Sequence, residues 1–197
     1  MLRGIDRIMR LIDVGGQKNR LDLNGRWEIM DIRAGADIII DLNTCSSFPV
    51  EQNSVDAHYI SHTLEHLAPE RVEKVLKEVY RTLRPGGLVR IVVPDIDVGI
   101  DWYLHSPNRL MERNSPTKPE TYPDTPLGYL LSWFYTPDRG AMNGHRMAFD
   151  FSTLYTYLMR AGFSEIIHKK QDSCSEMFKG KDIPRYKEYS LYVEAVK

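Results

Sequence analysis

Cysteines, long apolar runs and blocks of like charge are all scarce in this sequence. Its two cysteines, Cys45 and Cys174, lie far apart and form no Cys-x-x-Cys pair, which argues against a disulfide framework or a structural zinc site. No stretch approaches the roughly 20 consecutive apolar residues of a membrane-spanning helix. Asp6, Arg7 and Arg10 interrupt the N-terminal segment before the apolar core of a signal peptide could form. We therefore expect a cytoplasmic protein with reduced thiols and no membrane span.

Neither sign of charge is in excess. The 197 residues carry 26 Lys and Arg against 27 Asp and Glu, a formal charge of −1, and no basic block is long enough to follow a nucleic-acid backbone. Nucleic acid is therefore not an expected partner. With 42% hydrophobic residues, the length suits a single domain over residues 1–197 with a sizeable insertion. The oligomeric state stays open, and a homodimer is one option.

What the sequence does contain is an alternation of short apolar runs and helical stretches. Glycines, an Asn-Gly pair and other turn residues separate the runs, as they separate β-strands. The run ADIIIDL at 36–42 is continuously apolar, as strands buried on both faces of a parallel sheet are. Five strands are predicted in the first half of the chain, at 10–14, 27–32, 36–42, 54–62 and 88–95.

Two helices are predicted from apolar residues at helical spacing. The first begins at Pro69, a favoured first-turn residue, and ends at the stretch Arg84-Pro85-Gly86-Gly87. The second is FSTLYTYLMRAGF, with Gly162 in the usual C-terminal glycine position. After it, EIIHKKQ and SLYVEAV can pair as an antiparallel hairpin. The order of elements predicts an α/β protein, a Rossmann-like, doubly wound, mostly parallel sheet with a C-terminal antiparallel hairpin.

The region from about Ile96 to Asp150 is predicted to be an irregular insertion after the fifth strand, in the place of a lid. It is far longer than the few residues needed to join two elements, and it is rich in Pro, Tyr and Trp. Its aromatic side chains are expected to form a small core of its own more readily than a cage for a substrate. They are Trp102, Tyr103, Tyr122, Tyr129, Trp133, Phe134 and Tyr135.

Small or polar residues follow the ends of the first four predicted strands. Ligands bind at the carboxyl ends of parallel strands, and a glycine turn lets a ligand approach the backbone closely. An acid about 16 residues later can accept hydrogen bonds from both hydroxyls of a ribose. The pattern predicts a nucleoside pocket, although a plain tight turn and plain capping of strand ends are the alternatives. The residues are Gly15 and Gly16, Asp31, Asp41, and Ser61 with His62.

The stretch SHTLEHL contains His-x-x-Glu-His, the arrangement of the inverzincin metallopeptidases. On one long helix, His62 and His66 would face the same zinc ion beside Glu65. Here, however, His62 closes a predicted strand, Pro69 follows soon afterwards, and no third ligand is evident from the sequence. The pattern therefore does not favour a zinc hydrolase.

Six segments, in order, resemble the successive motifs of the class I S-adenosylmethionine-dependent methyltransferases of the type 11-like group: LIDVGG, EIMDI, DIIIDLN, SVDAHYISHTLEHL, LKEVYRTLRPGGLVRIVVPD and HRMAFDFSTLYTYLMRAGF. The resemblance spans most of the chain except the insertion, and its first motif is shorter than the family's usual glycine loop. It implies S-adenosyl-L-methionine as the cofactor. The implied cofactor contacts are Gly15 and Gly16 at the methionine part, Asp31 at the ribose, Asp41 and Leu42 at the adenine, and Ser61 and His62 near the sulfonium.

Three interpretations of residues 62–66 stay open. Glu65 and His66 can tie the turn together through hydrogen bonds, or a histidine can act as a general base that takes a proton from an acceptor hydroxyl. The stretch also resembles ubiquinone-pathway O-methyltransferases, where an acid, two spacers and Glu-His lie near a divalent cation. In this chain His62 replaces the acid, which weakens a site for a cation that prefers oxygen ligands. We therefore expect catalytic roles for His62, Glu65 and His66, and no metal.

The resemblance implies a methyltransferase, and we expect O-methylation of a small-molecule or carbohydrate-containing acceptor. Asp95, at the end of the fifth strand, and His145 with Arg146, before the last helix, are candidate acceptor contacts. Their plainer interpretations are the positioning of a loop and a solvated turn. A cofactor-binding but inactive scaffold or partner protein is one alternative function. A methyltransferase that acts on protein or RNA is another, although no basic surface run supports it.

Overall fold

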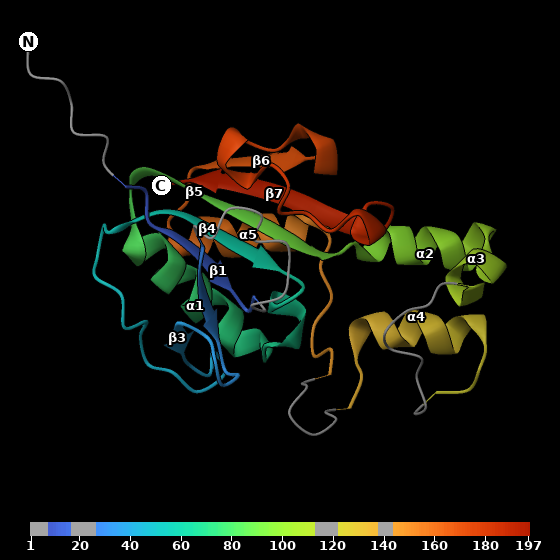
Figure 1. Cartoon of the computed structure of the whole chain (residues 1–197). Helices are drawn as coiled ribbons and strands as arrows, with labels where there is room; N and C mark the ends of the chain where they lie inside the picture. Colours follow the sequence, from blue (N-terminus) through green and yellow to red (C-terminus); the bar gives the residue numbers. More distant parts are fainter. Residues whose placement is uncertain (1–7, 17–26, 113–121, 138–143) are drawn as a thin grey trace, which may run out of the picture.

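The computed structural model describes residues 8–16, 27–112, 122–137 and 144–197, and contains a seven-stranded sheet (Figure 1). The strands are β1 (Leu11–Val14), β2 (Trp27–Asp31), β3 (Ile38–Ile39), β4 (Val55–Ser61), β5 (Leu83–Pro94), β6 (Glu165–Lys169) and β7 (Ser190–Val196). Their order is β3-β2-β1-β4-β5-β7-β6. Strands β1 to β5 are parallel to one another, and β7 is antiparallel to both β5 and β6. The predicted fold class, including the C-terminal antiparallel hairpin, is confirmed.

The third strand differs from its prediction. Only Ile38 and Ile39 pair with β2, and Ile39 is 64% exposed to solvent. The prediction of a strand buried on both faces was therefore wrong. An apolar run of this length does not distinguish a central strand from an edge strand, and β3 lies at the edge of the sheet.

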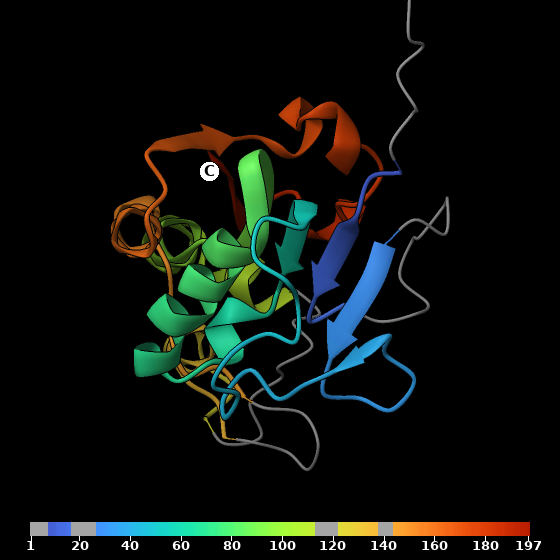
Figure 2. The ribbon, with the colours of Figure 1, turned by 90° about the vertical axis from the view of Figure 1, so that its left-hand side faces the viewer.

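Two helices cover one face of the sheet (Figure 2). Helix α1 (Pro69–Thr82) buries Val72, Val75, Leu76 and Val79, which recur at helical spacing. Helix α5 (Phe151–Ala161) buries Leu154, Leu158 and Ala161, and ends at Gly162, whose φ of +113° places it in the left-handed region. Both predicted helices, with the proline and glycine that bound them, are confirmed.

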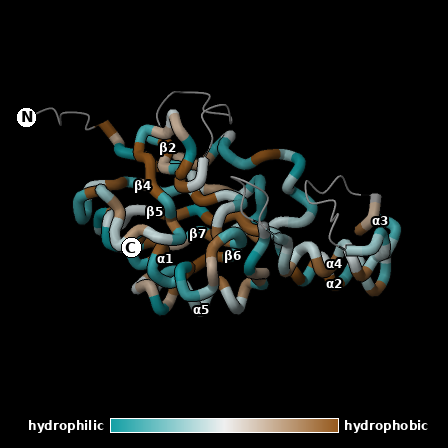
Figure 3. The backbone as a smooth tube through the Cα atoms, turned by 90° about the horizontal axis from the view of Figure 1, so that it is seen from below, coloured by the Kyte–Doolittle hydropathy of each residue, from teal (hydrophilic) through white to brown (hydrophobic). Residues whose placement is uncertain are grey.

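The opposite face is covered by the segment between β6 and β7, which we call the β6–β7 connection (residues 170–189). It contains three short 3-10 turns, Gln171–Ser173, Glu176–Phe178 and Pro184–Tyr186. Phe178 is fully buried on this face, against Trp27 and Tyr59. Within the described ranges, irregular chain thus seals this side of the sheet. Figure 3 shows hydrophobic stretches in the strands and hydrophilic outer loops.

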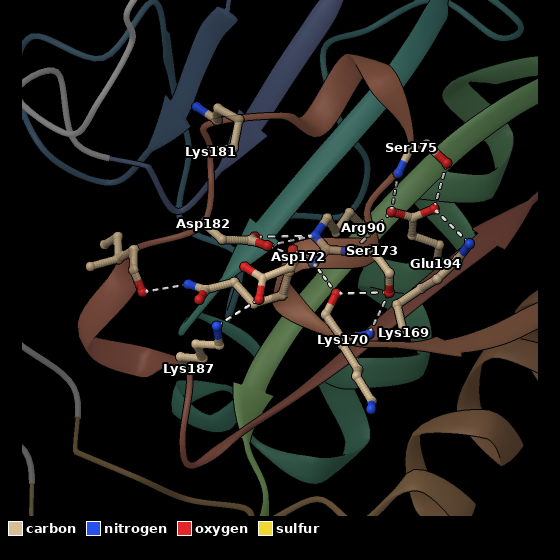
Figure 4. A network of polar contacts seen from close by, with 12 residues as sticks. Arg90, Lys169, Lys170, Asp172, Ser173, Ser175, Lys181, Asp182, Lys187 and Glu194 are labelled. Carbon is tan, nitrogen blue, oxygen red and sulfur yellow. Dashed lines mark hydrogen bonds and ion pairs between the residues drawn. The ribbon is translucent and has the colours of Figure 1, made fainter.

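A buried arginine holds the β6–β7 connection to the sheet (Figure 4). Arg90, in β5, is fully buried and donates from Nη1 to Glu194 of β7 at 2.8 Å and from Nε to Asp182 of the connection at 3.1 Å. Glu194 also accepts from the backbone N–H of Ser175 at 2.9 Å and from its hydroxyl. Arg90 therefore pairs with two buried carboxylates and ties three segments together, and the ammonium group of Lys169 lies 3.9 Å from Glu194 as a second, more distant cation.

The insertion is helical in its described part, so the expectation of irregular chain was wrong. It contains α2 (Ile96–His105), α3 (Pro107–Glu112) and α4 (Pro126–Phe134), which we call the helical lobe. The carboxylate of Asp95 caps α2 and the hydroxyl of Thr125 caps α4. These helices are short and rich in apolar residues, which leaves little periodic contrast to detect in the sequence. In Figure 1 the lobe stands to one side of the sheet.

The aromatic side chains of the insertion differ in burial, and Tyr103 and Tyr122 are intermediate. Trp102, Tyr129 and Trp133 are buried in a small core that also includes Tyr186 and Tyr189 of the β6–β7 connection. The expected core exists, but the lobe shares it with the β6–β7 connection and does not form it alone. Two others are exposed, Phe134 at 42% and Tyr135 at 54%. No helix in the described ranges is both long and apolar enough to cross a membrane.

A buried histidine makes the stability of this fold depend on pH. His58, in β4, is fully buried, and its Nε2 lies 2.8 Å from the hydroxyl of Thr82. That hydroxyl donates to the carbonyl groups of Glu78 and Val79, so it accepts from His58 Nε2–H, and Nδ1 carries the lone pair. Burial, assisted by the charge of Arg10, lowers the pKa of His58 from 6.5 to about 3.

Stability should therefore fall as the pH falls below 6.5. Between pH 6.5 and about 3 the unfolded chain takes up a proton at His58 that the folded chain does not, which costs about 1.4 kcal/mol per pH unit. Above pH 6.5 this histidine contributes no pH dependence. Urea unfolding from pH 7.5 to 5 should show a smaller loss of stability for His58→Gln, which keeps a donor to Thr82 but does not titrate. Equal slopes for both proteins would contradict the assignment.

Candidate active site

The turn after β1 lies close to the end of β4. Gly15 has a φ of +77°, and a Cβ at this position would lie 2.2 Å from the hydroxyl oxygen of Thr63. A Cβ on Gly16 would lie 2.5 Å from the carboxyl carbon of Asp13. Thr63 in turn donates to the carbonyl of Val14 at 3.2 Å. Both glycines are required here because no larger residue fits between these neighbours.

A small pocket opens beside this turn, lined by Asp13, Gly16, Tyr59, Ser61, Lys181 and Ile183. Its volume of about 10 Å³ has room for about one water molecule. The ammonium group of Lys181 donates to Asp13 at 2.7 Å and lies 4.7 Å from the ring centroid of Trp27 and 5.1 Å from that of Tyr59. The hydroxyl oxygen of Ser61 is buried and makes no hydrogen bond with the described residues.

Sequence reasoning missed Asp13 and Lys181. Asp13 could have been found, since a carboxylate within the apolar strand LIDV, directly before the glycine turn, is unusual unless it has a partner. Lys181 carried no such signal, because it lies in the β6–β7 connection, far along the chain.

The predicted nucleoside contacts lie at the same edge of the sheet. Asp31 ends β2 and is 7% exposed, and its carboxylate accepts from the N–H of Arg33 at 2.8 Å. Gly15 N–H donates to the backbone carbonyl of Met30 at 2.7 Å, and because Asp31 follows Met30, this bond places Asp31 near the glycine turn. Asp41 caps the following turn by accepting from Asn43 at 2.9 Å. Asp31 and Asp41 thus both accept hydrogen bonds from the turns that follow them, as the capping alternative expected. Their contacts with ribose and adenine stay predictions.

Leu42 has a different setting from Asp41. It is 8% exposed and belongs to the main core. Its carbonyl accepts two hydrogen bonds from Arg71 of α1, at 3.0 and 2.8 Å. Leu42 packs largely inward, and its contact with adenine stays a prediction.

His62 lies directly after β4 in a strained backbone conformation, with a φ of +50°. Its Nδ1 lies 3.2 Å from Oε1 of Glu65, and its Nε2 lies 3.1 Å from the hydroxyl of Ser190. The ring contacts that of Tyr186, with centroids 3.9 Å apart. Glu65 sits in one 3-10 turn, Leu64–His66, so the two histidines of the motif do not share the face of a long helix.

A third histidine reaches this turn from the end of the insertion. Arg146 N–H donates to the carbonyl of Glu65 at 2.8 Å, which places the preceding His145 next to His66, with ring centroids 5.0 Å apart. His66 Nδ1 lies 3.2 Å from the carbonyl of Gly144, and His145 Nδ1 lies 3.3 Å from that of Trp133. The sequence had placed His66 and His145 in separate roles, and the fold brings them together.

The charge on Glu65 is set by these imidazoles. Burial on its own would raise the pKa of this carboxyl, but contact with His62 and the nearby His66 and His145 outweighs it and lowers the pKa to about 2. Burial lowers the pKa of His145. At neutral pH the cluster therefore contains a buried carboxylate beside neutral His145. Neither oxygen of Glu65 makes a hydrogen bond of regular geometry with the described residues.

Asp95 and Arg146 occupy simpler positions. Asp95 caps α2 by accepting from Asp97 N–H at 3.1 Å, and burial raises the pKa of its carboxyl. This is the loop-positioning role that was the plainer interpretation. Arg146 anchors its segment through its backbone. Their contacts with an acceptor stay predictions.

Comparison with known proteins gives matches in sequence and in fold. Residues 21–91 match the family model described as "Methyltransferase domain". A comparison with curated protein sequences found no match. Among solved structures, the chain resembles a SAM-dependent methyltransferase from Archaeoglobus fulgidus, at 17% identity over 96% of this chain and 86% of that one, with a TM-score of 0.56.

Two further structures share the fold. One is a SAM-dependent methyltransferase from Methanosarcina mazei, at 16% identity over 97% of this chain and 93% of that one, with a TM-score of 0.55. The other is Burkholderia thailandensis 1,6-didemethyltoxoflavin-N1-methyltransferase with bound 1,6-didemethyltoxoflavin and S-adenosylhomocysteine. Its identity is 14% over 97% of this chain and 72% of that one, with a TM-score of 0.53.

Proposed function

We propose that the chain is a class I S-adenosylmethionine-dependent methyltransferase that transfers the methyl group to an oxygen of a small-molecule or carbohydrate-containing acceptor. One observation carries the proposal. Thr63, which a Cβ on Gly15 would meet, is the residue next to His62. The glycine turn for the cofactor and a histidine paired with a buried carboxylate are therefore adjacent.

The residues at the turn fit the cofactor. Gly15 and Gly16 leave their backbone open to close approach, and Ser61 offers a buried hydroxyl. Asp13 already holds an ammonium group, that of Lys181, and the α-amino group of the cofactor carries the same charge. When bound, the cofactor supplies an electrophilic methyl group on a sulfonium. Because the pocket has room for about one water molecule, we expect the chain around Lys181 to shift on binding.

Replacing Asp31 tests the ribose contact. Asp31→Ala should weaken binding of S-adenosylhomocysteine by roughly 1 to 3 kcal/mol, because a buried hydroxyl pair would lose its acceptor. Asp31→Asn, which still caps the turn at Arg33, should show part of this loss. Isothermal calorimetry would measure both, with the exposed Asp101→Ala as the control. Equal affinities for Asp31→Ala and the native protein would remove Asp31 from the site.

His62 is the proposed base for the acceptor hydroxyl. Since Nδ1 faces the Glu65 carboxylate at 3.2 Å, the proton sits on Nδ1 and the lone pair on Nε2. Nε2 could then take the proton that the acceptor loses, while Glu65 stabilises the imidazolium. The remaining catalysis comes from holding acceptor and methyl group in line within a covered site.

The helical lobe is the proposed lid and acceptor-selecting part. It follows directly from the carboxyl end of β5, and His145 and Arg146 lie where the chain returns to the sheet. The exposed rings of Phe134 and Tyr135 would suit a sugar or a flat acceptor. The B. thailandensis enzyme of the same fold has 1,6-didemethyltoxoflavin bound, which supports a small-molecule acceptor.

A metabolite screen tests the function itself. The purified chain and S-adenosyl-L-methionine would be incubated with a small-molecule extract, and mass spectrometry would search for a compound that gains one CH2. The gain should require both protein and cofactor. Methylation of the macromolecular fraction alone would overturn the choice of acceptor.

A further inference from the structure

The cluster around Glu65 has a composition and geometry that none of its separate roles explains. One ligand atom from each of Glu65, His66 and His145 lies within 4.8 Å of the other two. Glu65 is 1% exposed, and neither of its oxygens makes a regular hydrogen bond with the described residues. Its nearest polar neighbour is Nδ1 of His62, 3.2 Å from Oε1, and a buried carboxylate with so few partners is costly unless a cation or further donors reach it.

The two histidines are held in the form that binds metal. A carbonyl oxygen only accepts, so the contacts with Gly144 and Trp133 place a proton on Nδ1 of His66 and of His145. Each ring then has its lone pair on Nε2, and Nε2 of His66 lies 3.9 Å from Glu65. Histidine ligands of metals usually donate their other N–H to a backbone carbonyl or carboxylate in this way, which fixes the tautomer and the ring orientation.

We propose that Glu65, His66 and His145 bind one divalent transition-metal ion, with Zn²⁺ as the reference ion. Two imidazole nitrogens and one carboxylate oxygen suit first-row metals such as Zn²⁺, Co²⁺ and Mn²⁺ better than Mg²⁺ or Ca²⁺, which prefer oxygen ligands. Three protein ligands leave a position open, as in catalytic zinc sites. With bonds of about 2.0 to 2.2 Å, the side chains must close slightly around the ion.

The open position explains what the site does. The three ligand residues lie beside His62, whose Nδ1 contacts the same carboxylate. An ion held by these three residues would supply Lewis-acid chemistry, since an acceptor hydroxyl that reached it would lose its proton more easily. This role rests on the proposed function, whereas the metal binding does not.

The site revises the expectation of no metal. That expectation came from the missing third ligand within SHTLEHL, and from His62 in place of an acid. His145 supplies the third ligand from far along the chain, and it lies within reach only because Arg146 and Met147 donate to the carbonyl of Glu65, at 2.8 and 3.3 Å.

The test is direct metal binding to the full chain without a histidine tag. Protein stripped with a chelator and dialysed would be titrated with ZnCl₂ in a calorimeter and with CoCl₂ in a visible spectrometer. We expect one ion per chain and cobalt bands typical of nitrogen and oxygen ligands. His145→Gln and His66→Gln should each weaken Zn²⁺ binding by roughly 10- to 100-fold or more. His105→Gln, at a mostly exposed position on α2, should bind like the native protein.

Several outcomes would overturn the site. One is the absence of saturable binding at millimolar zinc. Another is equal zinc affinity of the native protein and His145→Gln. Circular dichroism checks that each variant is folded, and Glu65→Gln provides a third variant if one histidine variant is not. Calorimetry with S-adenosylhomocysteine and the metabolite screen are separate measurements. Metal binding without methyl transfer would leave the site standing and reject the proposed function, and the reverse result would reject only the site.

Discussion

Arg90→Met is expected to lower the free energy of unfolding by roughly 3 to 5 kcal/mol, because it removes the hydrogen-bonded cation of two buried carboxylates and leaves only Lys169, 3.9 Å from Glu194. Arg90 is fully buried, and the side chains of Asp182 and Glu194 are only 6% and 3% exposed. Methionine fills part of the volume but cannot neutralise either acid. Urea denaturation at neutral pH measures the loss as a lower midpoint at a similar slope.

A matched surface variant separates this effect from the loss of any ion pair. Arg109 pairs with Glu188 at 2.8 Å, but their side chains are 53% and 67% exposed. Loss of this ion pair should therefore cost only about 0 to 1 kcal/mol, and Arg109→Met also removes a cation–π contact, since the guanidinium lies 4.8 Å from the ring centroid of Trp102. In the triple variant Arg90→Met, Asp182→Asn, Glu194→Gln, removal of the uncompensated charges should restore part of the stability. If Arg90→Met and Arg109→Met were equally stable, the buried network would not hold the fold together.

The loss should also reach the cofactor site. Asp182, a partner of Arg90, is next to Lys181, whose ammonium group lies against Asp13 in the pocket. A loosened β6–β7 connection would change the wall of that pocket. We therefore expect weaker binding of S-adenosylhomocysteine by Arg90→Met under conditions where the variant is still folded.

His62→Asn is expected to reduce turnover by roughly 100- to 10,000-fold, the usual contribution of a positioned base. Asparagine tolerates the left-handed φ of +50° at this position better than alanine does, so strain is not added. It cannot accept the proton of the acceptor at neutral pH. Affinity for S-adenosylhomocysteine should stay within a few-fold, because the change acts on the chemical step. Steady-state kinetics and calorimetry measure the two effects separately.

A purely structural role for His62 would give the opposite pattern. If the histidine only ties the turn to Ser190 and Glu65, the variant should lose stability while the folded fraction keeps its turnover. Glu65→Gln gives a second readout, because loss of the carboxylate beside His62 should shift the pH profile of turnover. His105→Asn, at a mostly exposed histidine, is the control. Unchanged turnover of His62→Asn would end its role as a base.

The sequence alone determined the elements whose signals are local. The spacing of Val72, Val75 and Val79 predicts α1, and Pro69 and Gly162 mark a helix start and a helix end. Each of these signals acts within a turn or two of the chain, where propensity, capping and periodicity operate. The glycine turn at Gly15 could also be predicted from the sequence. So could the class of sheet, because the alternation of strands and helices allows few arrangements.

Only the tertiary structure decided which distant side chains meet. His145 lies beside Glu65 and Lys181 beside Asp13 because the insertion and the β6–β7 connection return to the sheet at those points. The burial of Arg90 and the exposure of Ile39 depend likewise on what covers each strand. Neighbours of this kind are fixed by the packing of segments far apart in the sequence, and no local pattern records that packing. The chemistry of the cluster around Glu65 therefore follows from contacts that exist only once the chain has folded.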